Sequence, residues 1–304
     1  MNTQSNAIPD TPSAAQGFAP AVIPESRLLY WSVLREVWES RSIYIAPLAV
    51  AALTLVGHLI ATIGRAMSVT NLAQRGAILE EHYSFAEFAI MGTTFVVAVF
   101  YCLDALHGER RDRSILFWKS LPVSDLTTVL SKAAIPLVVL PLLTFAITVI
   151  TQLIMALMSS AVLLGSGLSV AAFWAQLSVP QTWLGLLYHL VAIHSLWYAP
   201  IFGWLLLVSA WARRAPVLWA AVPLLAIALV EKIAFNTTHF ATMLANRVGG
   251  GPEAVTMPGG SPMDPTTHLT PGHFLTSAGL WIGLAITAAF LAGAVRLRRS
   301  QGPI

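Results

Sequence analysis

No Asp, Glu, Lys or Arg occurs between Lys132 and Arg213. A bilayer core about 30 Å thick needs roughly 20 mostly apolar residues per helix, so a stretch of this length can cross it more than once. The rest of the chain is similar, because 56% of its 304 residues are hydrophobic and only 10% are charged. Backbone amides cannot stay unpaired in hydrocarbon. The sequence therefore predicts an all-α integral membrane protein.

Six segments are long and apolar enough to be expected as spans. They lie at about 43–64, 88–106, 133–158, 182–210, 215–235 and 275–295. Residues 25–304 are thus expected to form a single transmembrane domain, with a long outer loop at 236–274. Residues 1–24 contain no Lys or Arg and several prolines, and are expected to be a disordered cytosolic tail rather than a secretory signal.

The distribution of the cations predicts the orientation. With both termini cytosolic, 13 of the 17 lysines and arginines fall on the inner side, as the positive-inside rule requires. A seventh span at 161–179 would move Arg213, Arg214 and the arginines of the last segment outside, so six spans in an inner (plasma) membrane are preferred. The inner cations are Arg27, Arg35, Arg41, Arg110, Arg111, Arg113, Lys119, Lys132, Arg213, Arg214, Arg296, Arg298 and Arg299.

The segment before the first span predicts an amphipathic helix lying flat at the inner leaflet, since its apolar residues recur every three or four positions. An ordinary interfacial anchor and a moving element are both open interpretations. The apolar positions are Leu28, Trp31, Leu34, Val37 and Trp38, and the polar ones are Ser32, Arg35, Glu36, Glu39 and Ser40.

The inner loop at 107–125 gathers charges of both signs around the aromatic pair Phe117-Trp118. Orienting a membrane protein needs cations, but neither acids nor aromatics. We therefore interpret the loop as a docking surface, with a plain topogenic loop as the alternative. The sequence predicts a short helix at 114–121 that Pro122 stops, and then a new helix capped at 124 or 125.

The spacing within this loop resembles that of the permeases of type-2 ABC exporters. In that family an ER-x-x-G-[ST] motif precedes a leucine-rich turn, a proline and a later lysine. Arg113 occupies the place where the family commonly has glycine. The interfacial helix, the six-span plan and the long loop before the last span also fit. The matching residues here are Glu109, Arg110, Ser114, Leu116, Leu121, Pro122, Val123, Ser124, Leu130 and Lys132.

The resemblance implies that the loop is a coupling helix inserted into a separate cytosolic ATP-binding subunit. The chain has no G-x-x-x-x-G-K-[ST] motif, so ATP is expected in that partner and no cofactor in this chain. A second permease copy, homo- or heterodimeric, is implied as well, and no nucleic acid. The residues expected to contact the ATPase subunit are Glu109, Arg110, Arg113, Ser114, Phe117, Trp118 and Pro122.

Four polar residues share one face of the expected third span, after two prolines that should bend it. They could line a translocation path, or they could bond their own backbone and bridge helices. Both interpretations stay open from the sequence. The residues are Thr144, Thr148, Thr151 and Gln152.

Histidines at membrane depth suggest a different class of function, an integral-membrane metal or haem oxidoreductase. His189 and His194 are five residues apart, so they are predicted not to share a face of an α-helix, and His58 has no partner evident in the sequence. A membrane anchor or sensor that recruits a cytosolic partner through 107–125 is a third hypothesis. The only cysteine, Cys102, excludes an intrachain disulfide.

Overall fold

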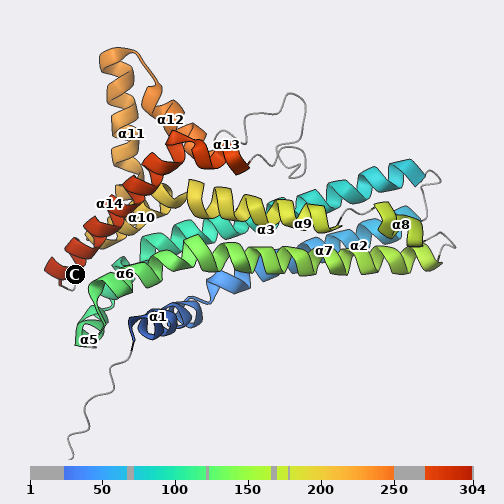
Figure 1. The fold of residues 1–304 in the computed structure, drawn as a ribbon, viewed down its shortest axis with the longest axis horizontal. Helices are drawn as coiled ribbons and strands as arrows, with labels where there is room; N and C mark the ends of the chain where they lie inside the picture. The colour runs from blue at the N-terminus through green and yellow to red at the C-terminus, as the bar shows by residue number, and fades with distance from the viewer. Residues whose placement is uncertain are drawn as a thin grey trace, which may run out of the picture.

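A computed structural model describes residues 24–66, 72–120, 123–165, 170–176, 179–249 and 271–302. Every regular element in these ranges is helical (Figure 1). Along the chain they are α1 (Glu25–Glu39), α2 (Ser42–Ala66), α3 (Leu72–Ala105), α4 (His107–Arg111), α5 (Ile115–Ser120), α6 (Asp125–Ala134), η1 (Ile135–Val139), α7 (Leu140–Gly165), α8 (Val170–Gln176), α9 (Val179–His189), η2 (Leu190–Trp197), α10 (Ala199–Trp211), α11 (Pro216–Phe235), α12 (His239–Val248), α13 (Pro271–Thr276) and α14 (Ala278–Ser300).

Within the described residues, five helices are long and apolar enough to cross a membrane, and a sixth candidate is a bent pair. The five are Ser42–Ile63, His82–Arg111, Asp125–Gly165, Pro216–Phe235 and Ala278–Ser300, and the pair is Thr182–Trp197 with Ala199–Trp211. The chain is therefore all-helical and compatible with a multi-pass membrane protein. The predicted fourth span at 182–210 corresponds to this bent pair, whose two halves meet at 44°.

The second and third expected spans are much longer than predicted. α3 begins at Leu72 rather than at 88, and the third run extends over Asp125–Gly165. Its 41 residues measure about 60 Å at 1.5 Å per residue, twice the hydrocarbon thickness. The run takes up the start of 161–179, and the seven-residue α8 follows, so no seventh span forms in the described part of that stretch. The first part of α3, at 72–87, was not predicted because its charged residues favour a loop outside the membrane. The residues around those charges are nevertheless strong helix formers.

Two π-helical segments interrupt the long helices. η1 contains Pro136, whose missing amide forces the hydrogen bonds to rearrange, and η2 ends just before Pro200 at the 44° bend. In a π-helix the backbone bonds run from i to i+5, so residues five apart stack. The rings of His189 and His194 accordingly lie 5.7 Å apart. The prediction that they would not share a face is wrong for this reason.

The main apolar core lies where α3, the start of the third run and α10 meet. Phe202, Leu206, Ile135 and Leu140 are all at most 2% exposed there. α11 contributes little to it, because Ala220 is its only buried residue and the helix stands away from the other long helices in Figure 1. The bundle proper is thus formed by α2, α3, α7 and α10 with α14, leaving α11 as an outlying helix.

The predicted outer loop 236–274 begins with the helix α12, whose last turn returns to the bundle. Arg247 lies with its guanidinium 4.1 Å from the ring centre of Trp197, and donates to the Gly279 carbonyl at 3.2 Å. A side chain at Gly283 would collide with this guanidinium. The small residues of α14 therefore make room for an arginine of the same chain.

Candidate functional site: the α4–α5 loop and its ionic base

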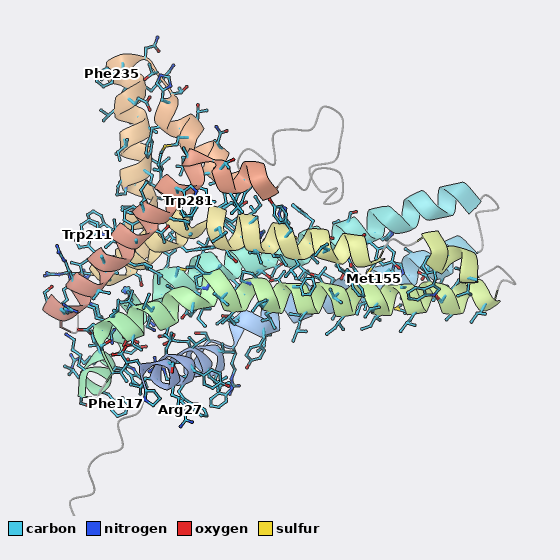
Figure 2. The ribbon with its side chains drawn as sticks, viewed as in Figure 1. Arg27, Phe117, Met155, Trp211, Phe235 and Trp281 are labelled. Carbon is cyan, nitrogen blue, oxygen red and sulfur yellow. The ribbon has the colours of Figure 1, made fainter. Side chains whose placement is uncertain are left out.

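The short helix α5 carries an exposed apolar ridge at one end of the molecule. Leu116 and Phe117 are each 59% exposed, whereas Ile115 is 1% exposed and anchors the helix to the protein. Figure 2 shows Phe117 at this end, far from Phe235. The Trp118 ring lies edge-on to Phe117 at 4.9 Å and beneath the guanidinium of Arg35, 3.8 Å from its centre. The ridge is therefore fixed against α1.

The turn between α4 and α5 has a left-handed residue. Arg113 has φ of 60°, in the region where a Cβ is unfavourable and glycine is preferred. This is the position at which the resembling exporters commonly have glycine. A left-handed turn is thus formed here by an arginine, and Ser114 Oγ donates to the Glu109 carbonyl across the turn at 3.4 Å.

After the ridge, the chain starts a new helix at the predicted cap. Ser124 Oγ accepts a hydrogen bond from the Thr127 amide at 3.0 Å, which satisfies one free amide of α6. The prediction of a cap at 124 or 125 is confirmed as Ser124. Pro122 is both the expected helix stop and one of the expected contact residues. It lies outside the described residues, as does Leu121.

Beneath the ridge, Glu109 of α4 forms the centre of a buried ion network. It is 8% exposed, and its carboxylate pairs with Lys132 of α6 at 3.0 Å and with Arg298 of α14. Arg298 also donates to Asp125 at 3.1 Å. A buried charge is tolerated only when it is paired, so these contacts hold α4, α6 and α14 in one register.

The network continues to α1 through Glu36, which is 3% exposed. Lys132 Nζ lies 3.0 Å from both Glu36 oxygens, and the Tyr101 hydroxyl donates to the carboxylate at 2.9 Å. Burial alone raises the pKa of the Glu36 carboxyl, but the charges of Lys132 and Arg35 outweigh it and hold the pKa below its usual value. Glu36 is therefore an ionised partner of the network. We call the set Glu36, Tyr101, Glu109, Asp125, Lys132 and Arg298 the ionic base.

Arg110, the second residue of the Glu-Arg pair, bonds backbone rather than carboxylates. Its side chain is 6% exposed and donates to the carbonyls of Ala210 at 2.7 Å and Ala212 at 3.3 Å, at the end of α10. The last carbonyls of a helix have no partner within the helix. Arg110 thus secures α4 to α10, while Glu109 secures it to the other helices.

The structure separates the expected contact residues into two groups. Arg113 and Phe117 are exposed and Ser114 and Trp118 are half-buried, so they can contribute to a contact surface. Glu109 and Arg110 are buried and contact other helices of the same chain, and their expected contact with a partner stays a prediction. The sequence analysis also placed Glu36 on the polar face of its helix, whereas it points into the protein.

Sequence reasoning missed the partners of Glu109. The sequence predicts Lys132 and Arg298 as inner cations, Lys132 also as part of the loop spacing, and Asp125 as one of two alternative helix caps. It does not pair them with Glu109, because nothing in one sequence pairs residues so far apart. A signal was available at Lys132, which follows the apolar residues Val129 and Leu130 and begins the uncharged stretch. An ionisable residue in such a position usually has a named partner.

Comparison with known proteins gives no assignment: no protein-family model, no curated protein and no solved structure matches the chain. Functional inference therefore depends on the residues and their geometry alone.

The polar face expected in the third span is buried among neighbouring helices. Thr144 Oγ1 lies 2.9 Å from Thr94 Oγ1 of α3, and Gln152 accepts a bond from the Trp183 indole of α9 at 3.0 Å. Thr151 donates to the carbonyl one turn before it. Thr148 is fully buried, and its hydroxyl has no partner among the described residues. In this arrangement Thr144 and Gln152 bridge helices within the chain, whereas Thr151 bonds its own helix and Thr148 bonds nothing in the described part of the chain.

The histidines form two separated pairs. His58 is 1% exposed and lies 3.1 Å from Ser159 Oγ, with the His82 ring 5.9 Å away. His189 and His194 form the other pair. Among the described residues, no group of three or more His, Cys, Asp or Glu is placed to hold a metal ion. The first pair is held by a ring contact and the His58–Ser159 hydrogen bond, and the second by a ring contact.

Proposed function

We propose that this chain is the membrane-spanning permease subunit of an ATP-driven exporter in the inner (plasma) membrane, with both termini cytosolic. A separate cytosolic ATPase subunit would dock on the loop at 109–125, and two permease copies would form the complex. The loop spacing and the arrangement of the site support this proposal. ATP is bound by the partner, and this chain supplies the docking ridge and the moving helices.

The observation that carries the proposal is the combination of the exposed ridge with the buried base. Leu116 and Phe117 expose apolar surface, which is unusual next to charged residues unless something covers it. Directly behind them, Glu109 is joined by ion pairs to α6 and α14. A push on the ridge is thereby delivered to several helices at once rather than absorbed by a flexible loop.

Coupling requires the loop to transmit free energy from the ATPase subunit to the helices. Moving a two-state equilibrium from 1:99 to 99:1 takes about 5.5 kcal/mol of differential binding. A loop attached only through backbone would yield before transmitting that energy. Removing one partner of a buried ion pair typically costs about 3–5 kcal/mol, so a network of such pairs has comparable strength.

Room for movement exists beside the base. A cavity of about 500 Å³ lies between the α1–α2 elbow, at Ser40 and Arg41, and the α3–α4 junction, at Asp104 and Gly108. Glu36 and Lys132 also line it. We propose that α1 shifts into this space when the ridge is displaced, which gives the interfacial helix a moving role.

The test is affinity purification of the chain in mild detergent, followed by an assay for a co-purified ATP-hydrolysing subunit. Phe117→Asp should abolish the co-purified ATPase activity, because it places a charge in the apolar contact. Trp118→Ala and Arg113→Glu should keep the subunit but uncouple hydrolysis from transport. Phe235 is another exposed aromatic, 74% exposed at the far end of α11, and the control variant Phe235→Ala should behave as wild type. Wild-type chain without any ATPase subunit, or normal transport by both uncoupling variants, would refute the proposal.

A further inference from the structure

The end of α14 is attached to the ridge, not only to the neighbouring spans. Lys119 Nζ of α5 donates to the Gln301 carbonyl at 3.0 Å, and Arg110 Nε donates to the Gly302 carbonyl at 3.4 Å. Arg298, one turn earlier, is locked into the ionic base. Residues 298–302 therefore run alongside the loop, and Figure 1 shows the end of α14 and α5 at the same end of the molecule.

Cations without carboxylate partners surround this attachment. Arg296 and Arg299 of α14 are exposed, as are Arg213 and Arg214 directly after α10, which packs along α14. In the described part of the chain no Asp or Glu lies within 4 Å of any of these four, whereas the exposed Arg111 pairs with Asp104 and Asp112. These four cations lie after α10 and near the end of α14, two helices that pack against each other, and we call them the cationic rim.

We infer that the docking surface has a second half: the last turn of α14 and residues 300–302, with the cationic rim, contact an acidic face of the same ATPase subunit. This rests on the proposed function and adds to it a second contact and the charge of the partner. Charge complementarity of this kind orients partners and speeds their encounter more than it adds affinity. The apolar ridge would then attach the ATPase subunit, and the cationic rim would orient it.

A protein partner fits this rim better than lipid headgroups alone. Lipid would explain cations at the ends of α10 and α14, as the positive-inside rule does. It does not explain why two cations of the loop, Lys119 and Arg110, bond the backbone just beyond α14 and so hold that segment beside α4 and α5. Continuity with the ridge is what a single large partner requires.

Cross-linking from single cysteines tests the second half directly. The native Cys102 is fully buried and should not react, so Ser120→Cys, at the end of α5 beside the ridge, and Ser300→Cys each present one accessible thiol. With a short bifunctional cross-linker, both should join the co-purified ATPase subunit in the assembled complex. Cross-linking from Ser120→Cys without Ser300→Cys would overturn this inference and leave the proposed function standing. Cross-linking from neither would refute the proposed function itself.

Charge reversal tests the nature of the partner face. Arg299→Glu should weaken association with the ATPase subunit roughly three- to tenfold at low salt, and the difference should shrink as salt screens it. Lys232→Glu, the same change on α11, is the control and should leave association unchanged. An effect of Arg299→Glu that appears only in vesicles containing anionic lipid, and not in neutral detergent, would assign the rim to lipid and overturn the inference.

Discussion

The ionic base and the polar face of α7 are both buried polar regions, but they are built from different groups. The base uses full charges that α1, α4, α6 and α14 contribute, with Tyr101 of α3. The α7 face uses hydroxyls and an amide, and Thr144 and Thr151 also bond the carbonyl one turn before them. Charges need partners from other helices, whereas a threonine can be satisfied by its own helix.

This difference in chemical groups indicates which region can transmit a movement between helices. Separating the pairs of the base leaves buried charges uncompensated, so the attached helices should move together. The α7 face can lose a neighbour at little cost, because the hydroxyls of Thr144 and Thr151 keep their intrahelical bonds. We therefore expect substitutions in the base to affect the whole fold and those on α7 to have local effects.

Glu109→Gln should give the largest effect. It leaves Lys132 and Arg298 buried with one charged partner fewer, and we expect the free energy of unfolding to fall by about 3–5 kcal/mol. Thermal unfolding of the purified chain in detergent measures this. The matched variant Glu39→Gln removes an exposed carboxylate, 63% exposed, and should change stability by less than about 0.5 kcal/mol. Equal effects of the two variants would mean that the base does not hold the helices.

Glu36→Gln should lower the free energy of unfolding by a smaller amount, about 2 kcal/mol at neutral pH, because Lys132 still pairs with Glu109. This effect should depend on pH. The pKa of Glu36 is lowered in the folded state, so its stabilisation is present above the usual value of 4.5 and is lost as pH falls through the folded-state pKa. The difference between wild type and Glu36→Gln should therefore shrink below pH 4.5 in unfolding measurements. A difference that stays constant with pH would exclude an ionised Glu36.

Thr144→Val and Thr148→Val test how much the hydroxyls of the α7 face contribute to stability. Thr144 bonds across to Thr94, so its loss should cost about 1 kcal/mol. Valine has nearly the same shape as threonine, and the Thr148 hydroxyl has no partner among the described residues. Thr148→Val should therefore leave the free energy of unfolding unchanged or raise it. If transport falls with Thr148→Val while stability is unchanged, the face has a role in the translocation path.

Arg113→Gly should give a small effect of the opposite sign, an increase of about 0.5–1 kcal/mol in the free energy of unfolding. Its φ of 60° is strained for arginine and free for glycine. Unfolding in detergent again measures the change. Destabilisation would show that the guanidinium contributes a contact worth more than the backbone strain.

The sequence predicted the helical membrane-compatible fold and the placement of the loop, because hydropathy and the cap at Ser124 are local properties. It did not predict the bend near Pro200 or the stacking of His189 with His194, which depend on a π-helical segment that no residue pattern specifies. The ionic base was also out of reach. Glu36 and Lys132 are 96 residues apart, and only the folded chain brings them together.

The most direct test of the account is the sidedness of the ridge. Phe117→Cys, with Cys102 buried, should react with a membrane-impermeant maleimide only in inside-out vesicles, while a cysteine at Thr237 next to α12 should react only in intact cells. That result would place the ridge and its ionic base where a cytosolic ATPase can reach them. Labelling of Phe117→Cys in intact cells would contradict the central claim.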